Sequence, residues 1–275
     1  NSNKSPFNVI KGSIHGHSIT YDCPADFEHE VVMHGTIYPI LQEIKSKSSN
    51  LVNMLDIKDR FLEYRRCYYE MDKIFPYVID ETLMQKIQRG IIPTTVLLDD
   101  EGAQKTINSF NNSENDKYLL EIFSKMQTLI MLTPGLNKDY FSTGGNKASS
   151  WLELGENKIK MLFSLLGISY EQYCASLILL LQSTLKKNII LTDVEFILGS
   201  VKTDQGFRNG IFMIDFDKVV EKTTPVTPFD IRNLLSQDMF PDVVRSSILG
   251  SVYQKKYLKY KKKYLNLKNK ITKYN

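Results

Sequence analysis

The sequence predicts an α+β protein built from two lobes and a tail. A small β-rich lobe spans 1–75, a larger and mostly helical lobe spans 76–250, and 251–275 forms a basic C-terminal helix. Three observations predict this division. Short apolar runs between turns precede Pro76, a strongly apolar helix covers 170–187, and an acidic hairpin follows that helix.

The composition is that of an ordinary globular protein. Hydrophobic residues make up 42% and charged residues 24% of the 275 residues, which allows a sizeable core. The longest apolar run, 177–181, is too short to cross a bilayer, so we expect no membrane span. Cys23, Cys67 and Cys174 are odd in number and far apart, so we expect a reducing, intracellular location without a disulfide framework.

The N-terminal lobe alternates short apolar runs with turns. Asp26 is a suitable N-cap for a helix that begins near Phe27, and acidic residues fill its early turns. Pro76 cannot donate to a sheet ladder, so it ends the last strand and marks the lobe boundary. The predicted strands are 7–11, 18–21, 51–56 and 66–74, with a charged connector between the last two.

The second lobe has mainly helical periodicity. The segment 137–150 contains a Gly-rich patch, but no Gly-Lys-Ser/Thr follows it, so it predicts a plain loop. The run 170–187, capped by Ser169, is apolar nearly all round, which is typical of a buried central helix. The predicted helices are 80–89, 117–132, 154–166, 170–187, 228–235 and 241–248.

Two apolar runs, 189–199 and 211–220, predict a hairpin with the polar stretch 202–210 as its connector. Each run carries two carboxylates, and burying a carboxylate is costly unless it is paired, hydrogen-bonded or bound to a metal. Such acids can hold Mg²⁺ against nucleotide phosphates. They can also simply face water at the strand ends. The four acids are Asp193, Glu195, Asp215 and Asp217.

The order of these elements resembles the protein-kinase-like fold. Lys11, in Val9-Ile10-Lys11, looks like the nucleotide-contacting lysine, and Glu30 lies on the following helix, where its partner glutamate would be. The run 69–74 looks like the hinge strand. Ile214-Asp215-Phe216-Asp217 is similar to the metal-binding Asp-Phe-Gly segment with its glycine replaced.

More specifically, the chain resembles a kinase-like family of unknown function that is known mainly from fungal proteins. Its Asp-Val-Glu-Phe-Val-Leu-Gly signature and the Leu-Asp-Phe segment after it are matched by 193–199 and 214–216. Met33-His34 matches the family's Met-His on the first helix, and 71–74 matches its Met-Glu-Arg-Ile hinge. The resemblance covers roughly 9–220.

The resemblance implies a nucleotide site with ATP and Mg²⁺ as cofactors. Its nucleotide-binding residues would be Lys11, Glu30 and Met71. The metal would be held by Asp215 and Asp217, and the catalytic pair would be Asp193 and Glu195.

The sequence also departs from active kinases. No glycine-rich loop precedes Lys11, the His-Arg-Asp catalytic loop is missing, and Phe196 cannot bind Mg²⁺. Phosphoryl transfer needs a positioned base and a clamped metal. We therefore favour a non-catalytic, pseudokinase-type binding or scaffold protein. The alternative is an atypical Mg²⁺-dependent phosphotransferase, a protein or small-molecule kinase, that uses Lys11, Glu30, Asp193 and Asp215.

The tail differs from the body in charge. The segment 253–275 holds nine lysines and no acid, which leaves 26 basic against 31 acidic residues, a net charge of −5, in the body. We therefore expect nucleic-acid binding only through the tail. Apolar residues in 253–271 follow a heptad spacing, which predicts a coiled-coil-like helix that binds a protein partner. They are Tyr253, Tyr257, Tyr260, Tyr264, Leu267 and Ile271.

The run 257–268 is similar to the C-terminal ends of many giant-virus proteins of the mimivirus type. The richness in Asn, Ile, Lys and Tyr fits an AT-rich genome. This resemblance implies a giant-virus protein located in the host cytoplasm or in the virion.

Overall fold

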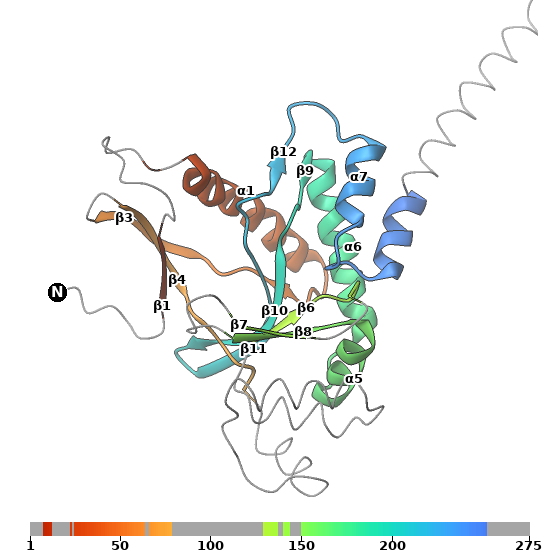
Figure 1. Ribbon diagram of the computed structural model, residues 1–275, viewed down its shortest axis with the longest axis horizontal. Coiled ribbons are helices and arrows are strands. Elements are labelled where there is room, and N and C mark those ends of the chain that lie inside the picture. The colour runs from red at the N-terminus through yellow and green to blue at the C-terminus, as the bar shows by residue number, and fades with distance from the viewer. Residues whose placement is uncertain are drawn as a thin grey trace, which may run out of the picture.

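The computed structural model describes residues 8–12, 23, 25–63, 66–78, 129–136, 140–143 and 150–251 (Figure 1). Several predicted elements lie outside these ranges. They are the strand at 18–21, the helix at 80–89, all but the end of the helix at 117–132, and the tail helix at 253–271.

Three antiparallel strands form a small sheet near the N-terminus, in the order β1-β4-β3. They are β1 (Asn8–Gly12), β3 (Ile57–Glu63) and β4 (Arg66–Asp72). Strand β3 includes the segment that was predicted to be a charged connector. Because it lies at the sheet edge, its charged side chains Lys58, Asp59 and Arg60 are exposed to water, and no core has to accommodate them.

Helix α1 (Ala25–Lys47) lies between this sheet and the rest of the molecule. Its residues Ile37, Ile40 and Leu41 are almost fully buried. Pro39 lies inside the helix, where it removes one backbone hydrogen bond. The helix was predicted to begin near Phe27, and it begins two residues earlier.

A larger mixed sheet of seven strands forms the centre, in the order β2-β11-β10-β6-β8-β7, with β5 paired to β10. The strand β6 was predicted to be the end of a helix. Its four apolar residues fit a buried strand as well as a buried helix, and β6 pairs with β10 on one side and β8 on the other. Part of the predicted loop 137–150 is also strand, as β7 and β8. The strands are β2 (Val52–Asn53), β5 (Ile74–Phe75), β6 (Leu129–Leu132), β7 (Tyr140–Thr143), β8 (Ser150–Leu154), β10 (Glu195–Thr203) and β11 (Gly206–Ile214).

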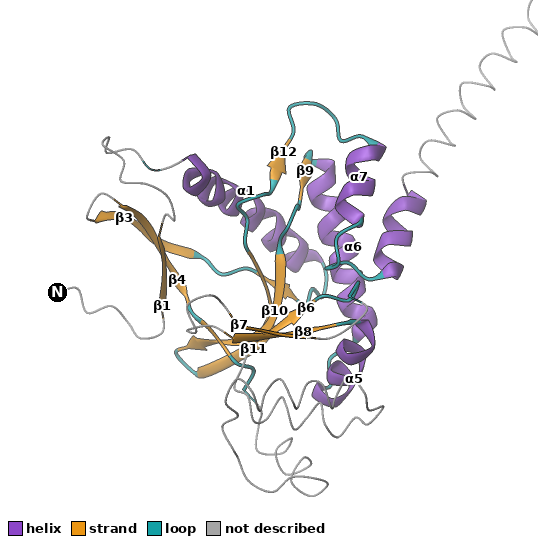
Figure 2. Ribbon diagram, in the orientation of Figure 1, coloured by secondary structure: helices purple, strands orange, loops and turns teal. Residues whose placement is uncertain are grey.

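Helices gather on one side of this sheet (Figure 2). They are α5 (Glu156–Leu166), α6 (Tyr170–Lys186), α7 (Pro228–Leu235) and a helix described over 242–251. The predictions for α5, α6 and α7 are confirmed. The Ser169 side chain accepts a hydrogen bond from the Gln172 backbone N–H, as predicted for the N-cap of α6.

One hydrophobic core joins the two regions that were predicted as separate lobes. It includes Ile37 and Leu41 of α1 together with Leu177 and Leu181 of α6. Strand β5, at the expected boundary, pairs with β10. The described part of 76–250 also contains strands β6 to β12, so it holds more sheet than the mostly helical region that was predicted. The α+β class itself is confirmed.

The acidic hairpin exists, but its turn is much shorter than predicted. Strands β10 and β11 pair continuously from Glu195↔Ile214 to Thr203↔Gly206, so that Asp204 and Gln205 form the turn. Gly206 has φ +124°, a conformation that side chains disfavour. Residues Phe207 to Asn209 were assigned to the connector because they lie within a mainly polar run. All three are exposed near the hairpin tip, where a strand needs no apolar face.

A disulfide joins Cys23 to Cys67, with their Cα atoms 5.6 Å apart. The prediction of no disulfide was wrong. The two cysteines are 44 residues apart in sequence, but the first turn of α1 packs on β4, where Phe27 and Tyr69 lie against each other. Cys174 is a buried free cysteine.

We expect Leu180→Ala to lower the free energy of unfolding by about 2–5 kcal/mol, because truncating a core leucine leaves a cavity. Leu180 is fully buried in α6, whereas its neighbour Leu179 is 37% exposed. Leu179→Ala is therefore the matched control and should cost less than about 1 kcal/mol. Urea denaturation measures both changes. Equal losses in the two variants would contradict the central position of α6.

We expect Cys23→Ser to lower the free energy of unfolding by about 2–4 kcal/mol, because the disulfide restricts the unfolded chain. Adding a reductant to the wild-type protein should produce a similar loss. The same reductant should not change the free energy of unfolding of Cys23→Ser, since Cys174 forms no bond that could be reduced. A wild-type protein whose stability does not respond to complete reduction would refute this role.

Candidate functional site

Two short loops lie side by side because strand pairs hold both of their ends. Strands β10 and β11 pair at Glu195↔Ile214, and β9 (Ile189–Ile190) pairs with β12 (Val220–Glu221). Loop 191–194 and loop 215–219 lie between these two pairings. We call them the acidic loops, because they and their flanking residue Glu195 carry all four acids predicted for the site.

Asp193 is exposed and forms an ion pair with Lys218 of the other acidic loop. The Asp193 backbone N–H donates a 2.8 Å hydrogen bond to the side chain of Gln237. The hydrogen bond and charge of Asp193 raise the pKa of Lys218, and Asp217 and Asp215 add to the increase. Lys218 therefore lies within the electrostatic reach of three carboxylates.

Asp193 and Asp215 both have a left-handed backbone, with φ +59° and +63°. Aspartate tolerates this conformation better than most residues, but it remains uncommon. Asp215 and Glu195 are half-buried, and Asp217 is exposed. The predicted acids thus come from adjacent loops, and two of them stand at unusual backbone positions.

Glu30 is buried on α1 and accepts a 2.9 Å hydrogen bond from the Tyr69 hydroxyl. Burial, followed by the negative charge of Glu30, raises the pKa of Tyr69 above its ordinary value of 10, and Asp215 and Asp217 raise it further. These electrostatic contributions place Glu30, Tyr69 and the second acidic loop in one neighbourhood.

Lys11 is the register partner of Tyr69 in the β1–β4 pairing. Its backbone therefore lies opposite the residue that bonds Glu30. The Lys11 side chain lies outside the described part of the structure.

Met71 lies on β4 between two small hydrophobic clusters. It packs against the cluster of Phe27, Cys67 and Tyr69 and also against Leu55 and its neighbours. The structure thus gives Met71 a packing role near the end of β4, where the resemblance implies the hinge.

Two histidines connect α1 to the segments around the acidic loops. The His29 Nε2 atom is 2.6 Å from the Val219 carbonyl oxygen, and the His34 Nε2 atom is 2.6 Å from that of Leu55. A carbonyl only accepts, so Nε2 carries the proton in both rings. Phe216 packs edge-on against the His34 ring, with centroids 5.3 Å apart. The conformation of the second loop thus depends on α1.

The sequence did not reveal several of these contacts. Lys218, His29 and Tyr69 were not predicted as site residues, although Lys218 directly follows Asp217. Their partners are 25, 190 and 39 residues away in sequence. Such pairings depend on how α1, β4 and β12 are placed in the fold.

Within the described ranges, no three His, Cys, Asp or Glu side chains form a group that could hold a metal ion by themselves. Mg²⁺ bound with a nucleotide commonly takes only one or two carboxylates, and phosphates and water supply the rest. The carboxylates of Asp215 and Asp217 suit that kind of metal–phosphate complex better than a metal bound by protein alone.

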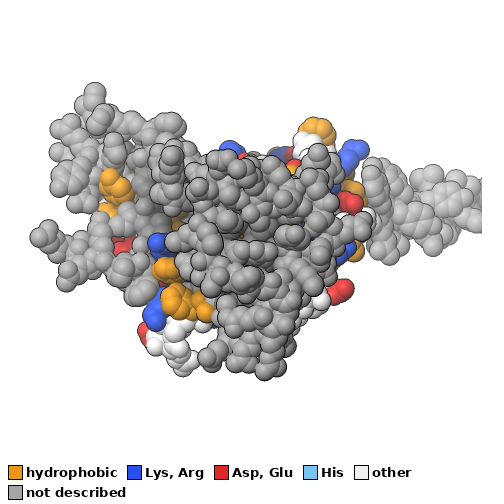
Figure 3. Space-filling view, turned by 60° about the horizontal axis from the view of Figure 1, so that its bottom comes forward, with side chains coloured by type: hydrophobic (Ala, Val, Ile, Leu, Met, Phe, Trp, Pro, Cys, Tyr) orange, Lys and Arg blue, Asp and Glu red, His pale blue; other side chains and the backbone are white. Residues whose placement is uncertain are grey.

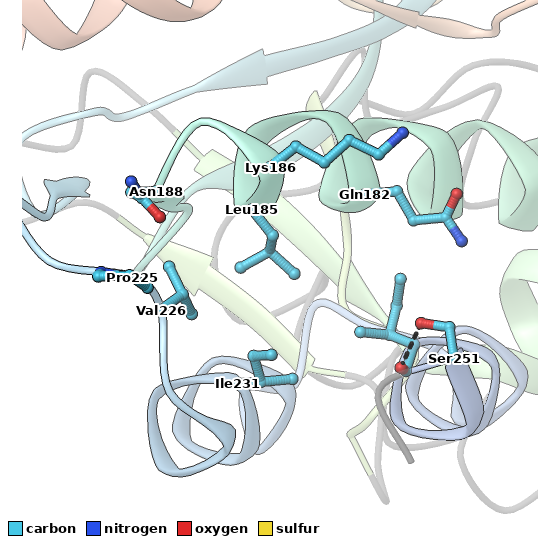
Figure 4. A pocket seen from close by; sticks show the side chains of 9 residues that line it. Gln182, Leu185, Lys186, Asn188, Pro225, Val226, Ile231 and Ser251 are labelled. Atoms are coloured by element: carbon cyan, nitrogen blue, oxygen red, sulfur yellow. Dashed lines mark hydrogen bonds between the residues drawn. The ribbon is translucent and has the colours of Figure 1, made fainter. Parts of the chain in front are cut away.

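A separate cavity of about 490 Å³ lies among the end of α6, the segment before α7, α7 itself and the helix described over 242–251. Figure 4 shows Leu185, Val226 and Ile231 lining its apolar part. Ser251, the last described residue, lines its edge and donates a hydrogen bond to the Ile248 carbonyl. The basic tail therefore begins beside this cavity.

We expect the stability of the wild-type protein to fall as the pH drops from about 7 to about 5, and His34 to account for part of this fall. Burial lowers the pKa of His34 from 6.5, so the folded state keeps the ring neutral while the unfolded chain takes up a proton. His34→Gln, whose amide can still donate to Leu55, should reduce the slope of unfolding free energy against pH. Leu180→Ala is the control, because it destabilises without removing a titratable group. An unchanged slope in His34→Gln would contradict this role.

The chain matches no family model, no curated protein sequence and no solved structure. Among the helices that the structure describes, none combines the length and apolarity needed to cross a membrane. What the site can do is therefore inferred from its own residues and their geometry.

Proposed function

We propose that the chain is a kinase-like, pseudokinase-type protein of a giant virus that binds a ligand or a partner without transferring phosphate. The order of elements supports the kinase-like part. Strand β1 carries Lys11, α1 carries Glu30, and β4 leads to the segment before Pro76. The buried helix α6 then precedes the first acidic loop, the hairpin and the Asp-Phe-Asp segment.

The first acidic loop is the observation that carries the non-catalytic part. Only 191–194 separate β9 from β10, whereas the kinase catalytic loop must hold both a base and a metal-binding asparagine within His-Arg-Asp-x-x-x-x-Asn. Leu191 and Val194 are fully buried, so they hold the backbone in place and offer no polar group. Asp193 is the acid of this loop, and it forms an ion pair with Lys218. This loop suits a binding site better than a site for proton abstraction.

A second candidate is an atypical Mg²⁺-dependent phosphotransferase. It is favoured by the proximity of Asp215 and Asp217 to Tyr69 and Glu30. In this case Lys11, Glu30 and Met71 would hold ATP, and Asp215 and Asp217 would hold Mg²⁺. Asp193 or Glu195 would then act as the catalytic base.

The partner and the location are further parts of the proposal. The heptad-spaced residues of 253–271 would bind a protein partner, and nucleic acid would bind only through the lysines of this tail. Of the two locations, the Cys23–Cys67 disulfide favours the virion. Disulfides persist at virion surfaces but rarely in the reducing cytosol.

Asp215→Asn tests the ligand site. If Mg·ATP binds, a concentration 100 times Kd should raise the wild-type melting temperature by roughly 5–10 °C, because the ligand stabilises only the folded state. The variant should lose the Mg²⁺-dependent part of this shift. Asp204→Asn, at the opposite end of the same hairpin, should keep it. Thermal denaturation with and without Mg²⁺ measures all three proteins.

Transfer of the γ-phosphate from labelled ATP separates the two candidate functions. The non-catalytic protein should show binding without transfer. Transfer that Asp193→Asn abolishes would establish the phosphotransferase and refute the pseudokinase. If ATP leaves the wild-type melting temperature unchanged both with and without Mg²⁺, the nucleotide is not a ligand of the acidic loops.

A further inference from the structure

The start of helix α1 packs outside the main core of the molecule. Among the described apolar residues of α1, those that belong to the main core begin at Met33. The preceding part of the helix, 25–32, contributes Phe27 and Val31 to a separate small cluster. We call 25–32 the N-terminal part of α1. Its position therefore depends on contacts that the main core does not supply.

The disulfide is the covalent link within that small cluster. It joins Cys67 of β4 to Cys23, which stands two residues before α1 begins. Among the described residues of the cluster, only Phe27, Cys67 and Tyr69 are buried. A hydrophobic core this small is rarely stable without a disulfide or another link. The disulfide therefore supplies much of what holds the N-terminal part of α1 on β4.

The same part of α1 makes two contacts with the region of the acidic loops. His29 donates from Nε2 to the Val219 carbonyl oxygen in loop 215–219, 2.6 Å away. Glu30 accepts the 2.9 Å hydrogen bond from the Tyr69 hydroxyl. Tyr69 stands two residues after Cys67 on β4, so both side chains point to the same face of the strand. One short segment thus connects the disulfide to the second acidic loop.

We propose that the Cys23–Cys67 disulfide is a redox switch for the second acidic loop. With the bond intact, the N-terminal part of α1 stays on β4, and His29 holds the Val219 carbonyl. With the bond reduced, this part of the helix loosens, and loop 215–219 loses its hydrogen bond to His29. The oxidised protein therefore has a firmly held loop, and the reduced protein has a loosened one.

The reductant of this switch is a dithiol. One thiolate of the dithiol attacks a cysteine sulfur and forms a mixed disulfide, and its second thiolate then displaces that cysteine. Two electrons and two protons pass to Cys23 and Cys67, which become thiols, and the dithiol becomes a disulfide. Cys23 is half-buried and Cys67 is buried. A small dithiol therefore approaches the bond from the side of Cys23.

The effect of the switch on ligand binding rests on the function proposed for the acidic loops, whereas its effect on the loop itself does not. Asp215 and Asp217 belong to the loop that His29 holds. A ligand that binds a loosened loop has to order it again, and this ordering weakens binding. Reduction should therefore lower the affinity for Mg·ATP if the acidic loops bind it.

Hydrogen–deuterium exchange of the ligand-free full chain, with and without dithiothreitol, tests the switch. Reduction should speed exchange in 25–32 and 215–221 by about tenfold, which corresponds to the loss of one net hydrogen bond. Strand β10 should keep its exchange rates, because its residues pack in the main sheet. Leu180→Ala is the control for general destabilisation. It should speed exchange in β10 as well, and its loop 215–219 should still respond to the reductant.

Two further variants test the path from the disulfide to the loop. The double variant Cys23→Ser, Cys67→Ser should exchange as the reduced wild type does, with or without dithiothreitol. His29→Ala keeps the disulfide and removes the donor to Val219. It should speed exchange in 215–221 before any reduction, and reduction should then add little there.

Unchanged exchange in 215–221 after complete reduction would overturn the proposal, and so would an increase of equal size in β10. A full reductant response of the loop in His29→Ala would overturn the role of His29. Thermal denaturation with Mg·ATP separates the switch from the proposed function. Equal ligand-induced shifts in the oxidised and reduced protein would overturn the effect on binding. No shift in either state would refute the nucleotide, while the exchange rates would still decide whether the loop responds to reduction.

Discussion

The acidic loops depend on being held at both ends by strand pairing. The β9–β12 pair and the start of the β10–β11 pair fix the four points from which the loops extend. The ion pair of Asp193 with Lys218 is exposed to water, and exposed ion pairs contribute little to stability. The buried side chains of Leu191, Phe216 and Val219 hold the loops far more firmly. The apolar side chains of the loops therefore supply most of the energy that holds the four acids in place.

Helix α1 links the second acidic loop to the small sheet. It bonds β4 through Glu30, touches Phe216 through His34 and reaches the Val219 carbonyl through His29. The Cys23–Cys67 disulfide fixes the start of the helix on the same sheet. A shift of α1 would thus disturb the second acidic loop. On the face shown in Figure 3, hydrophobic, basic and acidic side chains of the described part are visible near one another.

The sequence predicted the elements with strong local signals and missed those that depend on neighbours. Helix α6 follows from its apolar run and its Ser169 cap. The hairpin was also predicted, but its runs 189–199 and 211–220 were expected to be continuous strands, and loops 191–194 and 215–219 interrupt them. The apolar run 129–132 fits both a buried helix and a buried strand by sequence. Its pairing with β10 and β8 makes it a strand. The disulfide and the contact of Glu30 with Tyr69 join segments about forty residues apart. No local pattern specifies such contacts.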